Sequence, residues 1–390
     1  MLVVYLVSFN ADISFMTFTI SHVAIIGAGP SGLAAAQHLL AHQSTFSSIT
    51  IFERRERVGG VWNHDPTPSE SPWSSPMYDD LHANLPGSLM EFANRPFPDG
   101  EGARVFPDRE VIREYIEGYA DKEVRKCVRF GVEVEDVRRS AEGWTVSVTE
   151  IATGKGEVVE VDAVVVANGH YAIPQIPFMP GLDEFTARHP GVVTHSKLYR
   201  SNELFNDKSV IVVGNGPSGL DIARQISRTA HQPVCLSVRH STSPEKLKHC
   251  QAVEVPQIAA FMPETRGVRF IDGSETNNVD AIVMCTGYRY SYPFLQGVGS
   301  DVVDRAGKTT KGLYQWMFHQ DPTLVFLGLP MNVVPFPWVE AQAAVMTGVW
   351  ANELALVSEE TRAEWCQRLG REKGDARNRF AVGEDGVYLN

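Results

Sequence analysis

One short pattern occurs twice in the chain and constrains its fold more than any other feature. GAGPSGLAAAQHL at 27–39 reappears as GNGPSGLDIARQI at 214–226. Each copy follows a short apolar strand and opens a run of helix-forming residues. A G-x-G-x-x-G turn between a strand and a helix lets backbone N–H groups face a pyrophosphate. The repeat therefore predicts two dinucleotide-binding units in one chain.

Each position of this turn has its own physical requirement. The first glycine allows a tight turn, the second lets the pyrophosphate touch the backbone, and the third lets the helix pack on the strand. The candidate cofactor-binding residues are Gly27, Gly29, Pro30, Ser31 and Gly32 in the first turn, and Gly214, Gly216, Pro217, Ser218 and Gly219 in the second.

The two copies differ in the residue that ends the following strand. ITIFE ends at Glu53, whereas PVCLSVR ends at Arg239. A carboxylate accepts hydrogen bonds from ribose hydroxyls, and a guanidinium binds a 2′-phosphate bidentately. The first site is therefore predicted to bind FAD and the second NADPH. The alternative for Arg239 is a solvated charge at a strand end.

A second repeated pattern marks where the chain passes between the units. VDAVVVANGHY (161–171) and VDAIVMCTGYR (279–289) each run from an acidic turn through a buried strand to a glycine. Such a glycine suits close passage of the backbone past a cofactor, which makes Thr286 and Gly287 candidates. The alternative is that both are plain strand ends.

A complete nucleotide unit lies between these two patterns. We therefore expect an α/β fold with two Rossmann-like dinucleotide-binding domains, in which the NADPH domain is inserted into the FAD domain. The expected division is 17–171 for the first part of the FAD domain, 172–286 for the NADPH domain, and 287–390 for the rest of the FAD domain and a C-terminal tail. Residues 129–160 alternate as a β-meander that covers the FAD domain.

Composition excludes several other classes of protein. The formal charge of −12 with no basic block disfavours nucleic acid as a partner. Five cysteines without a C-x-x-C pair disfavour disulfides, zinc and a redox dithiol. No apolar run is long enough to span a membrane. We expect a soluble cytoplasmic protein whose first fifteen residues form an extension.

Several further segments complete a set that is similar to a known family. In order they are FERRERVGGVW (52–62), YDDLHANLPGSLMEFANRPFP (78–98), HPGVVTHSKLY (189–199), CTGY (285–288) and VVPFPWVEAQ (333–342). The set resembles the flavin-containing monooxygenases, of the soluble fungal or bacterial type, over nearly everything from His22 to Leu356.

The most family-specific element is the identifying motif F-x-G-x-x-x-H-x-x-x-Y. It aligns on His189, Gly191, His195 and Tyr199. This chain departs from the motif at His189, where the family has phenylalanine. Tyr199 separates the chain from the related Baeyer–Villiger enzymes, which typically carry tryptophan there.

The resemblance implies that the cofactor carries the chemistry. NADPH reduces the flavin, oxygen adds to it, and the hydroperoxide gives its distal oxygen to a soft nucleophile. The protein then has to exclude water and support the peroxide, which needs no nucleophilic side chain and no metal.

The resemblance also assigns residues to the site. Gly60, Val61 and Trp62 would bind FAD, Asn84 would face the reactive edge of the flavin, and Gln342 would lie near the flavin. His195 would help to seat NADPH. The alternatives are a turn-forming asparagine for Asn84 and a structural ring with satisfied nitrogens for His195.

Two helices are expected near the site. Asp108 caps a core-facing helix in the segment FPDREVIREYIEGYA (106–120), and Pro337 to Leu356 forms an apolar helix with Glu340 in its first turn. The start of the second helix directs its positive dipole end toward the flavin pyrimidine in the family. The tail from Ser358 is expected to be a surface helix and a loose end.

The predicted function is transfer of one oxygen atom from O2 to a sulfur or nitrogen nucleophile of a small molecule. Three alternatives stay open: Baeyer–Villiger oxygenation of ketones, NADPH-dependent reduction of a quinone without oxygenation, and a flavin-bound regulatory protein. The partners expected are the small-molecule substrate and O2, without nucleic acid or membrane, and a homodimer is compatible with the sequence.

Overall fold

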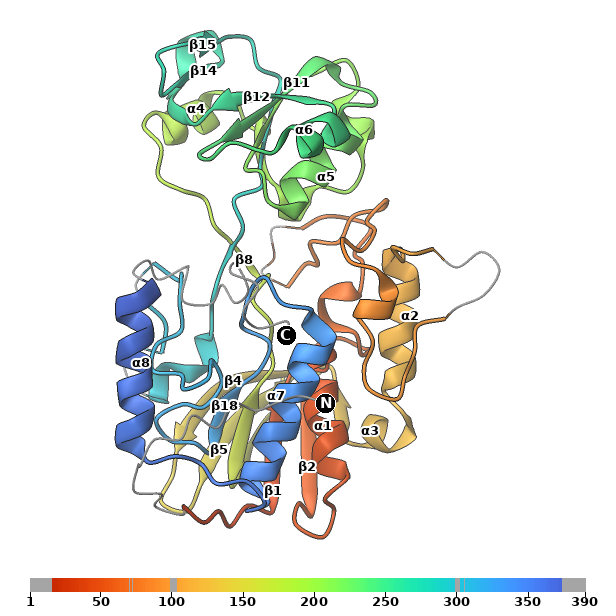
Figure 1. Cartoon of the computed structure of the whole chain (residues 1–390), viewed down its shortest axis with the longest axis vertical. Helices are drawn as coiled ribbons and strands as arrows, with labels where there is room; N and C mark the ends of the chain where they lie inside the picture. The colour runs from red at the N-terminus through yellow and green to blue at the C-terminus, as the bar shows by residue number, and fades with distance from the viewer. Residues whose placement is uncertain are drawn as a thin grey trace.

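The structure is a computed structural model that describes residues 16–69, 71, 73–98, 104–298, 302–304 and 306–373. The expected N-terminal extension and the end of the C-terminal tail lie outside these residues. The chain forms two bodies joined by a narrow connection near β8 (Ile173–Pro174), with one body built entirely from the middle of the chain (Figure 1).

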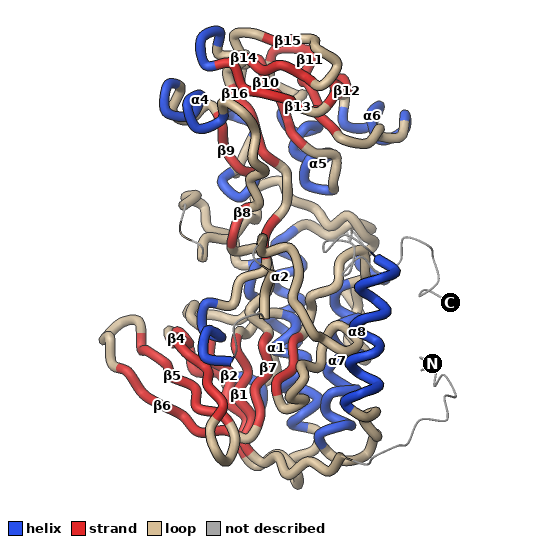
Figure 2. Tube along the Cα trace, turned by 90° about the vertical axis from the view of Figure 1, so that its left-hand side faces the viewer, coloured by secondary structure: helices blue, strands red, loops and turns tan. Residues whose placement is uncertain are grey.

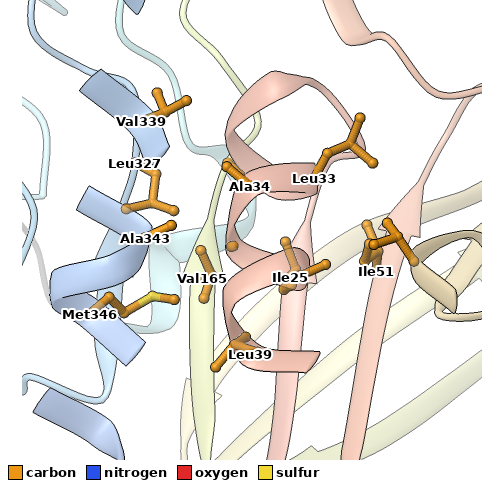
Figure 3. Packing of buried hydrophobic residues seen from close by; sticks show 14 of the residues in the cluster. Ile25, Leu33, Ala34, Leu39, Ile51, Val165, Leu327, Val339, Ala343 and Met346 are labelled. Carbon is orange, nitrogen blue, oxygen red and sulfur yellow. The ribbon is translucent and has the colours of Figure 1, made fainter. Parts of the chain in front are cut away.

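The first body is built on a five-stranded parallel sheet of order β18-β7-β1-β2-β3. Its strands are β1 (His22–Ile26), β2 (Ser48–Glu53), β3 (Val128–Phe130), β7 (Ala163–Val166) and β18 (Leu324–Phe326). Helices α1 (Pro30–Leu40) and α7 (Pro335–Trp350) pack together beside the sheet. In Figure 3, Ala34 of α1 faces α7 near Val339 and Ala343.

The second body repeats this arrangement, with a five-stranded parallel sheet of order β12-β11-β10-β16-β9. Its strands are β9 (Val193–His195), β10 (Ser209–Val213), β11 (His231–Val238), β12 (Ala252–Pro256) and β16 (Ala281–Met284). Strand for strand, β10, β11, β12 and β16 take the places of β1, β2, β3 and β7. The sequence repeat at 27–39 and 214–226 is therefore the visible part of a repeat of the whole sheet.

Each body also carries a three-stranded antiparallel meander, which precedes β7 in the first body and β16 in the second. The strands are β4 (Val132–Arg139), β5 (Trp144–Glu150) and β6 (Gly156–Val161) in the first body, and β13 (Ile258–Met262), β14 (Gly267–Phe270) and β15 (Glu275–Thr276) in the second. The meander expected over 129–160 is confirmed for 132–161, whereas Arg129 and Phe130 belong to β3 of the parallel sheet.

Two short strands form the connection between the bodies. β8 pairs antiparallel with β17 (Tyr288–Arg289), so the chain enters and leaves the second body along one ribbon (Figure 2). The α/β fold with one Rossmann-like unit inserted into the other is confirmed.

The remaining helices connect and cover the sheets. They are α2 (Arg109–Tyr119), α3 (Lys122–Lys126), α4 (Leu182–Arg188), α5 (Pro217–Ile226), α6 (Pro244–Cys250) and α8 (Glu359–Lys373), with short 3-10 helices η1 (Gly60–Trp62), η2 (Gly87–Leu89), η3 (Ser196–Leu198), η4 (Asn202–Phe205), η5 (Pro263–Thr265) and η6 (Pro293–Val298). Asp108 caps α2 as expected, because its side chain accepts a hydrogen bond from the Val111 N–H at 3.1 Å.

The apolar helix predicted from Pro337 to Leu356 differs at both ends. α7 begins at Pro335, since proline is well suited to the first position of a helix, and ends at Trp350, shortly before Asn352 with φ of 61°. Glu340 therefore lies beyond the first turn. Its carboxylate accepts hydrogen bonds from the Ala93 N–H and the Tyr119 hydroxyl, which fixes α7 to α2.

Candidate functional site

The glycines of the first turn are required by contacts of the backbone. Gly27 has φ of +104°, and a Cβ there would lie 2.7 Å from the Ala167 carbonyl oxygen. A Cβ on Gly32 would lie 1.9 Å from the Gly27 carbonyl oxygen. Only glycine fits either position, so at this turn the backbone after β1 comes close to the backbone that follows β7 and to the first turn of α1.

The second turn has nearly the same geometry. Gly214 has φ of +105°, and a Cβ there would lie 2.7 Å from the Cys285 carbonyl oxygen. A Cβ on Gly219 would lie 1.9 Å from the Gly214 carbonyl oxygen. The two turns are therefore equivalent in structure as well as in sequence.

Both turns lead into the start of a helix. Pro30 and Pro217 occupy the first position of α1 and α5, where the missing proline N–H costs nothing because the first N–H groups of a helix have no acceptor within it. Those N–H groups and the helix dipole favour an anion at each turn. Both turns fit the pyrophosphate of a dinucleotide.

The surroundings of the two turns differ. Gly60, with φ of +55°, approaches so closely that a Cβ on it would lie 2.9 Å from the Gly29 Cα. A Cβ on Gly216, the counterpart of Gly29, would meet no atom of the described residues within 4 Å. The segment of Gly60, Val61 and Trp62 thus covers the first turn, while the second turn is open.

Glu53 lies at the carboxyl end of β2, and only 5% of it is exposed. Its Oε2 accepts a hydrogen bond from the Ala28 N–H at 2.7 Å, and its Oε1 accepts one from the Arg55 N–H at 2.9 Å. Burial raises the pKa of Glu53, and these two N–H donors oppose that shift. Each carboxylate oxygen has a further lone pair, so the group can still accept hydrogen bonds from a ribose.

Arg239 follows the last residue of β11 and is exposed. The segment after it is tied to the second turn, because Asn215 Nδ2 donates to the His240 carbonyl oxygen at 3.0 Å and to Thr242 Oγ1 at 2.9 Å. The Asn215 side chain thus ties the segment after β11 to the second turn, and the Ala28 N–H ties Glu53 at the end of β2 to the first turn.

The counterpart of Glu53 is Val238, because the Gly27 N–H donates to the Phe52 carbonyl oxygen and the Gly214 N–H donates to the Ser237 carbonyl oxygen, both at 2.9 Å. Arg239 therefore lies one residue further along than expected, and opposite charges stand close to the same end of the two strands.

Gln342 lies on α7 close to the start of α1. Its Oε1 accepts a hydrogen bond from the Gly328 N–H at 3.0 Å, and a Cβ on Gly328 would lie 2.4 Å from Ser31 Oγ. Among the described residues, nothing accepts a hydrogen bond from the buried Gln342 Nε2. An unpaired buried donor at this point fits an acceptor of a bound group such as a flavin.

Asn84 is an exposed residue on a loop that is fixed on both sides of it. The Ala83 N–H donates to the Pro107 carbonyl oxygen at 2.8 Å, and the Gly87 N–H donates to the Val105 carbonyl oxygen at 2.9 Å. The backbone of the loop is therefore held while the Asn84 amide is left open to solvent.

His195 is a buried ring, with both nitrogens bonded to the backbone. Nδ1 accepts a hydrogen bond from the Lys197 N–H at 3.1 Å, so Nε2 carries the proton and donates to the Gly287 carbonyl oxygen at 3.1 Å. Burial lowers the pKa of His195 to about 4. These bonds match the alternative of a structural ring. Beside Gly287, Thr286 donates from Oγ1 to the Gln175 carbonyl oxygen.

The low pKa of His195 predicts an effect of pH on folding. Its unfolded pKa is near 6.5 and its folded pKa about 4, so between these values the unfolded state binds the extra proton and stability falls as pH falls. The loss is roughly 3 kcal/mol. Thermal unfolding from pH 8 to pH 4 should show this decline, and His195→Gln should have a shallower one. The exposed His22→Gln variant should keep the wild-type slope.

Two buried cations were not identified from the sequence. Lys197 and Arg200 are 1% and 6% exposed. Lys197 Nζ donates to the carbonyl oxygens of Ser71 and Ala172, and Arg200 donates to those of Asp65 and Ser75. Their partners are distant in sequence, so no local signal marks them. They join the segment after η1 to the start of the second body.

The fold and these turns define a protein with two dinucleotide-binding units. Comparison with known families makes this specific, because the family described as flavin-binding monooxygenase-like matches residues 20–243 and 244–378. The chain belongs to this family, as its motifs suggested.

Individual relatives agree with the family. The chain is 34% identical to a thiol-specific monooxygenase of Saccharomyces cerevisiae over 86% of this chain and 78% of the relative. It is 31% identical to a trimethylamine monooxygenase of Roseovarius sp. over 95% and 84%. The solved structure of S-allyl-L-cysteine S-oxygenase from Allium sativum matches with a TM-score of 0.83 and 31% identity, covering 95% of this chain and 87% of that one.

These similarities establish that the protein is a flavin monooxygenase, which acts on a small molecule and O2. In the part of the chain that the structure describes, no helix is long and apolar enough to cross a membrane, and no group of acidic, histidine and cysteine side chains could hold a metal ion.

Proposed function

We propose that the flavin is FAD, that the reductant is NADPH, and that the oxygen atom goes to a soft sulfur or nitrogen of a small molecule. One observation carries the choice of cofactors. Two turns of equivalent geometry are followed by strands with opposite charges at their ends: β2 ends at Glu53, and Arg239 comes directly after β11. A carboxylate selects a free ribose and a guanidinium selects a phosphorylated one.

The proposed FAD unit comprises 17–171 and 287–390. In it the turn at Gly27, Gly29, Pro30, Ser31 and Gly32 holds the pyrophosphate and Glu53 holds the adenosine ribose. Gly60, Val61 and Trp62 cover the turn, and the free Nε2 of Gln342 donates to the cofactor. FAD bound here supplies the redox chemistry that takes electrons from the nicotinamide and activates oxygen.

The proposed NADPH unit comprises 172–286. The turn at Gly214, Gly216, Pro217, Ser218 and Gly219 holds the pyrophosphate, and Arg239 binds the 2′-phosphate. Its open surroundings suit a coenzyme that binds and leaves in each cycle. Thr286, Gly287 and His195 hold the ribbon between the units.

The substrate class follows from the relatives and from the site. The names of the relatives describe oxygenation of thiols, of S-allyl-L-cysteine and of trimethylamine. We assign the Asn84 amide to the site and no charged side chain of the described residues to the oxygen transfer, which suits a nucleophile that attacks activated oxygen by itself. A panel of thiols, sulfides and tertiary amines, assayed for stimulated NADPH oxidation and oxygen uptake, tests this proposal, and stimulation by ketones alone would reject it.

The identity of the flavin has its own test. The purified protein should be yellow and should release FAD when denatured, because Glu53 and the first turn recognise an adenosine ribose and a pyrophosphate. Chromatography of the released flavin distinguishes FAD from FMN. Recovery of FMN from folded protein would overturn the assignment.

We also propose a cytoplasmic location. All five cysteines are free, in agreement with a reducing compartment.

A further inference from the structure

The segment Ser74–His82, which we call the strap, belongs to the first body in sequence. Ser75 Oγ donates to the Val61 carbonyl oxygen in η1, and the Arg109 N–H at the start of α2 donates to the Leu81 carbonyl oxygen at 3.0 Å. Asn84 follows the strap after one residue. The strap therefore leads from the cover of the first turn to the loop that carries Asn84.

The strap also bonds to the second body. Tyr78 is 6% exposed and is buried in the apolar cluster of the second body, next to residues of β10 and α5. Its hydroxyl donates to Asp221 Oδ2 on α5 at 2.6 Å. The Asp79 N–H donates to the Arg200 carbonyl oxygen at 2.9 Å, and Gln225 Nε2 donates to the Asp80 carbonyl oxygen at 3.3 Å.

These contacts form one network on α5. Gln225 Nε2 also donates to Asp221 Oδ2 at 3.0 Å, and its Oε1 accepts from the Tyr199 hydroxyl at 3.0 Å. The rings of Tyr78 and Tyr199 meet edge to face at 5.3 Å. A buried hydroxyl bonded to a carboxylate is among the stronger neutral-to-charged contacts in proteins.

The internal repeat shows what is unusual about this face of α5. Asp221 is the counterpart of Ala34 in the repeat at 27–39. Ala34 faces α7, which belongs to the same body (Figure 3). On α5 the equivalent residue is covered by Tyr78, from the other body. This face of α1 thus packs on a helix of its own body, whereas the same face of α5 bonds to a residue of the other body.

We propose that Tyr78 is a positioning residue: its hydrogen bond to Asp221 sets the distance and angle between α5 and the Asn84 loop. The proposal rests on the proposed function, since α5 begins at the turn assigned to NADPH. A coenzyme bound at that turn is then held at a fixed distance and angle from the flavin unit through Asp221, Tyr78 and the strap. The hydroxyl acts on geometry and takes no part in the chemistry.

The test is Tyr78→Phe, which removes the hydroxyl and keeps the buried ring. At saturating NADPH, flavin reduction per bound FAD should slow about tenfold, the effect of losing one hydrogen bond to a charged group. The KM for NADPH should change less than about threefold, because Arg239 and the second turn are untouched. Peroxide release per NADPH should rise.

Asp221→Ala supplies the second arm. It should slow reduction similarly, and Tyr78→Phe in that background should add little, because both remove the same bond. Tyr292→Phe is the matched control, since it removes a buried hydroxyl bonded to Thr310 Oγ1 at 3.0 Å in the apolar cluster of the first body, and this variant should reduce flavin at the wild-type rate.

Additive losses, or a Tyr78→Phe enzyme that reduces flavin at the wild-type rate, would overturn the positioning role. Loss of thermal stability alone, with reduction per bound FAD unchanged, would overturn it as well. A wild-type protein whose flavin NADPH does not reduce would overturn the proposed function instead, so the two failures are distinguishable.

Discussion

Replacing Arg239 by alanine is expected to weaken NADPH about 10- to 150-fold while leaving NADH nearly unchanged. The guanidinium is exposed at the end of β11, in a segment that Asn215 ties to the second turn. The lost contact with a 2′-phosphate is worth roughly 1.5–3 kcal/mol, and NADH lacks that phosphate. Steady-state KM values, or dissociation constants from titration of the flavin-bound enzyme, measure both coenzymes.

The matched control is Arg269→Ala. Arg269 is an exposed arginine of the same body, on β14, and pairs with Glu275 Oε1 at 2.8 Å. Arg269→Ala makes the same change in net charge as Arg239→Ala, so any general electrostatic effect on the coenzyme should appear in both variants. Equal losses for NADPH and NADH in Arg239→Ala would show that the phosphate is bound elsewhere, for example by His240 or Ser241.

Asn84→Leu is expected to separate NADPH oxidation from oxygen transfer. Leucine has a similar volume but no amide, so FAD and NADPH binding should be nearly intact and flavin reduction should continue. Preorganised donors of this kind contribute roughly 100- to 1000-fold where they act, so the ratio of oxygenated product to NADPH should fall steeply while hydrogen peroxide release rises. Product, peroxide and NADPH are measured in the same reaction in air.

Ser88→Leu serves as the control for that experiment, because Ser88 is exposed on η2, directly after the loop that carries Asn84. It adds the same apolar side chain and keeps the amide, so it should retain wild-type coupling. If Asn84→Leu also retains it, Asn84 is a turn-forming residue and nothing more.

Local patterns predicted most of the fold. The strand before each turn, the helix after it, the meander over 129–160 and the Asp108 cap depend on residues within one turn or one hairpin of each other. The glycine requirement at 32 is local, because it comes from the Gly27 carbonyl oxygen, whereas at 27 the closest contact is the distant Ala167 carbonyl oxygen. The residues that determine the local features are neighbours in the sequence, so a local pattern is enough to predict them.

Features that depend on distant partners were not predicted. Glu340 was placed at a helix start near the flavin, yet its carboxylate bonds to Ala93 and Tyr119, far away in sequence. The bond between Tyr78 and Asp221 spans 143 positions. The internal repeat carries one signal for this bond. Asp221 replaces Ala34 of the first copy, on the helix face that packs against α7 in that copy.

The central claim is that one atom of O2 enters a sulfur or nitrogen nucleophile at the expense of NADPH. It is tested most directly by turnover of the flavin-loaded enzyme under isotopically labelled O2, with the product examined by mass spectrometry beside the NADPH consumed. The account predicts one labelled oxygen atom in the product for each NADPH oxidised, on sulfur or nitrogen. Oxidation of NADPH that yields only labelled hydrogen peroxide with every such nucleophile, or product oxygen that comes from water, would contradict it.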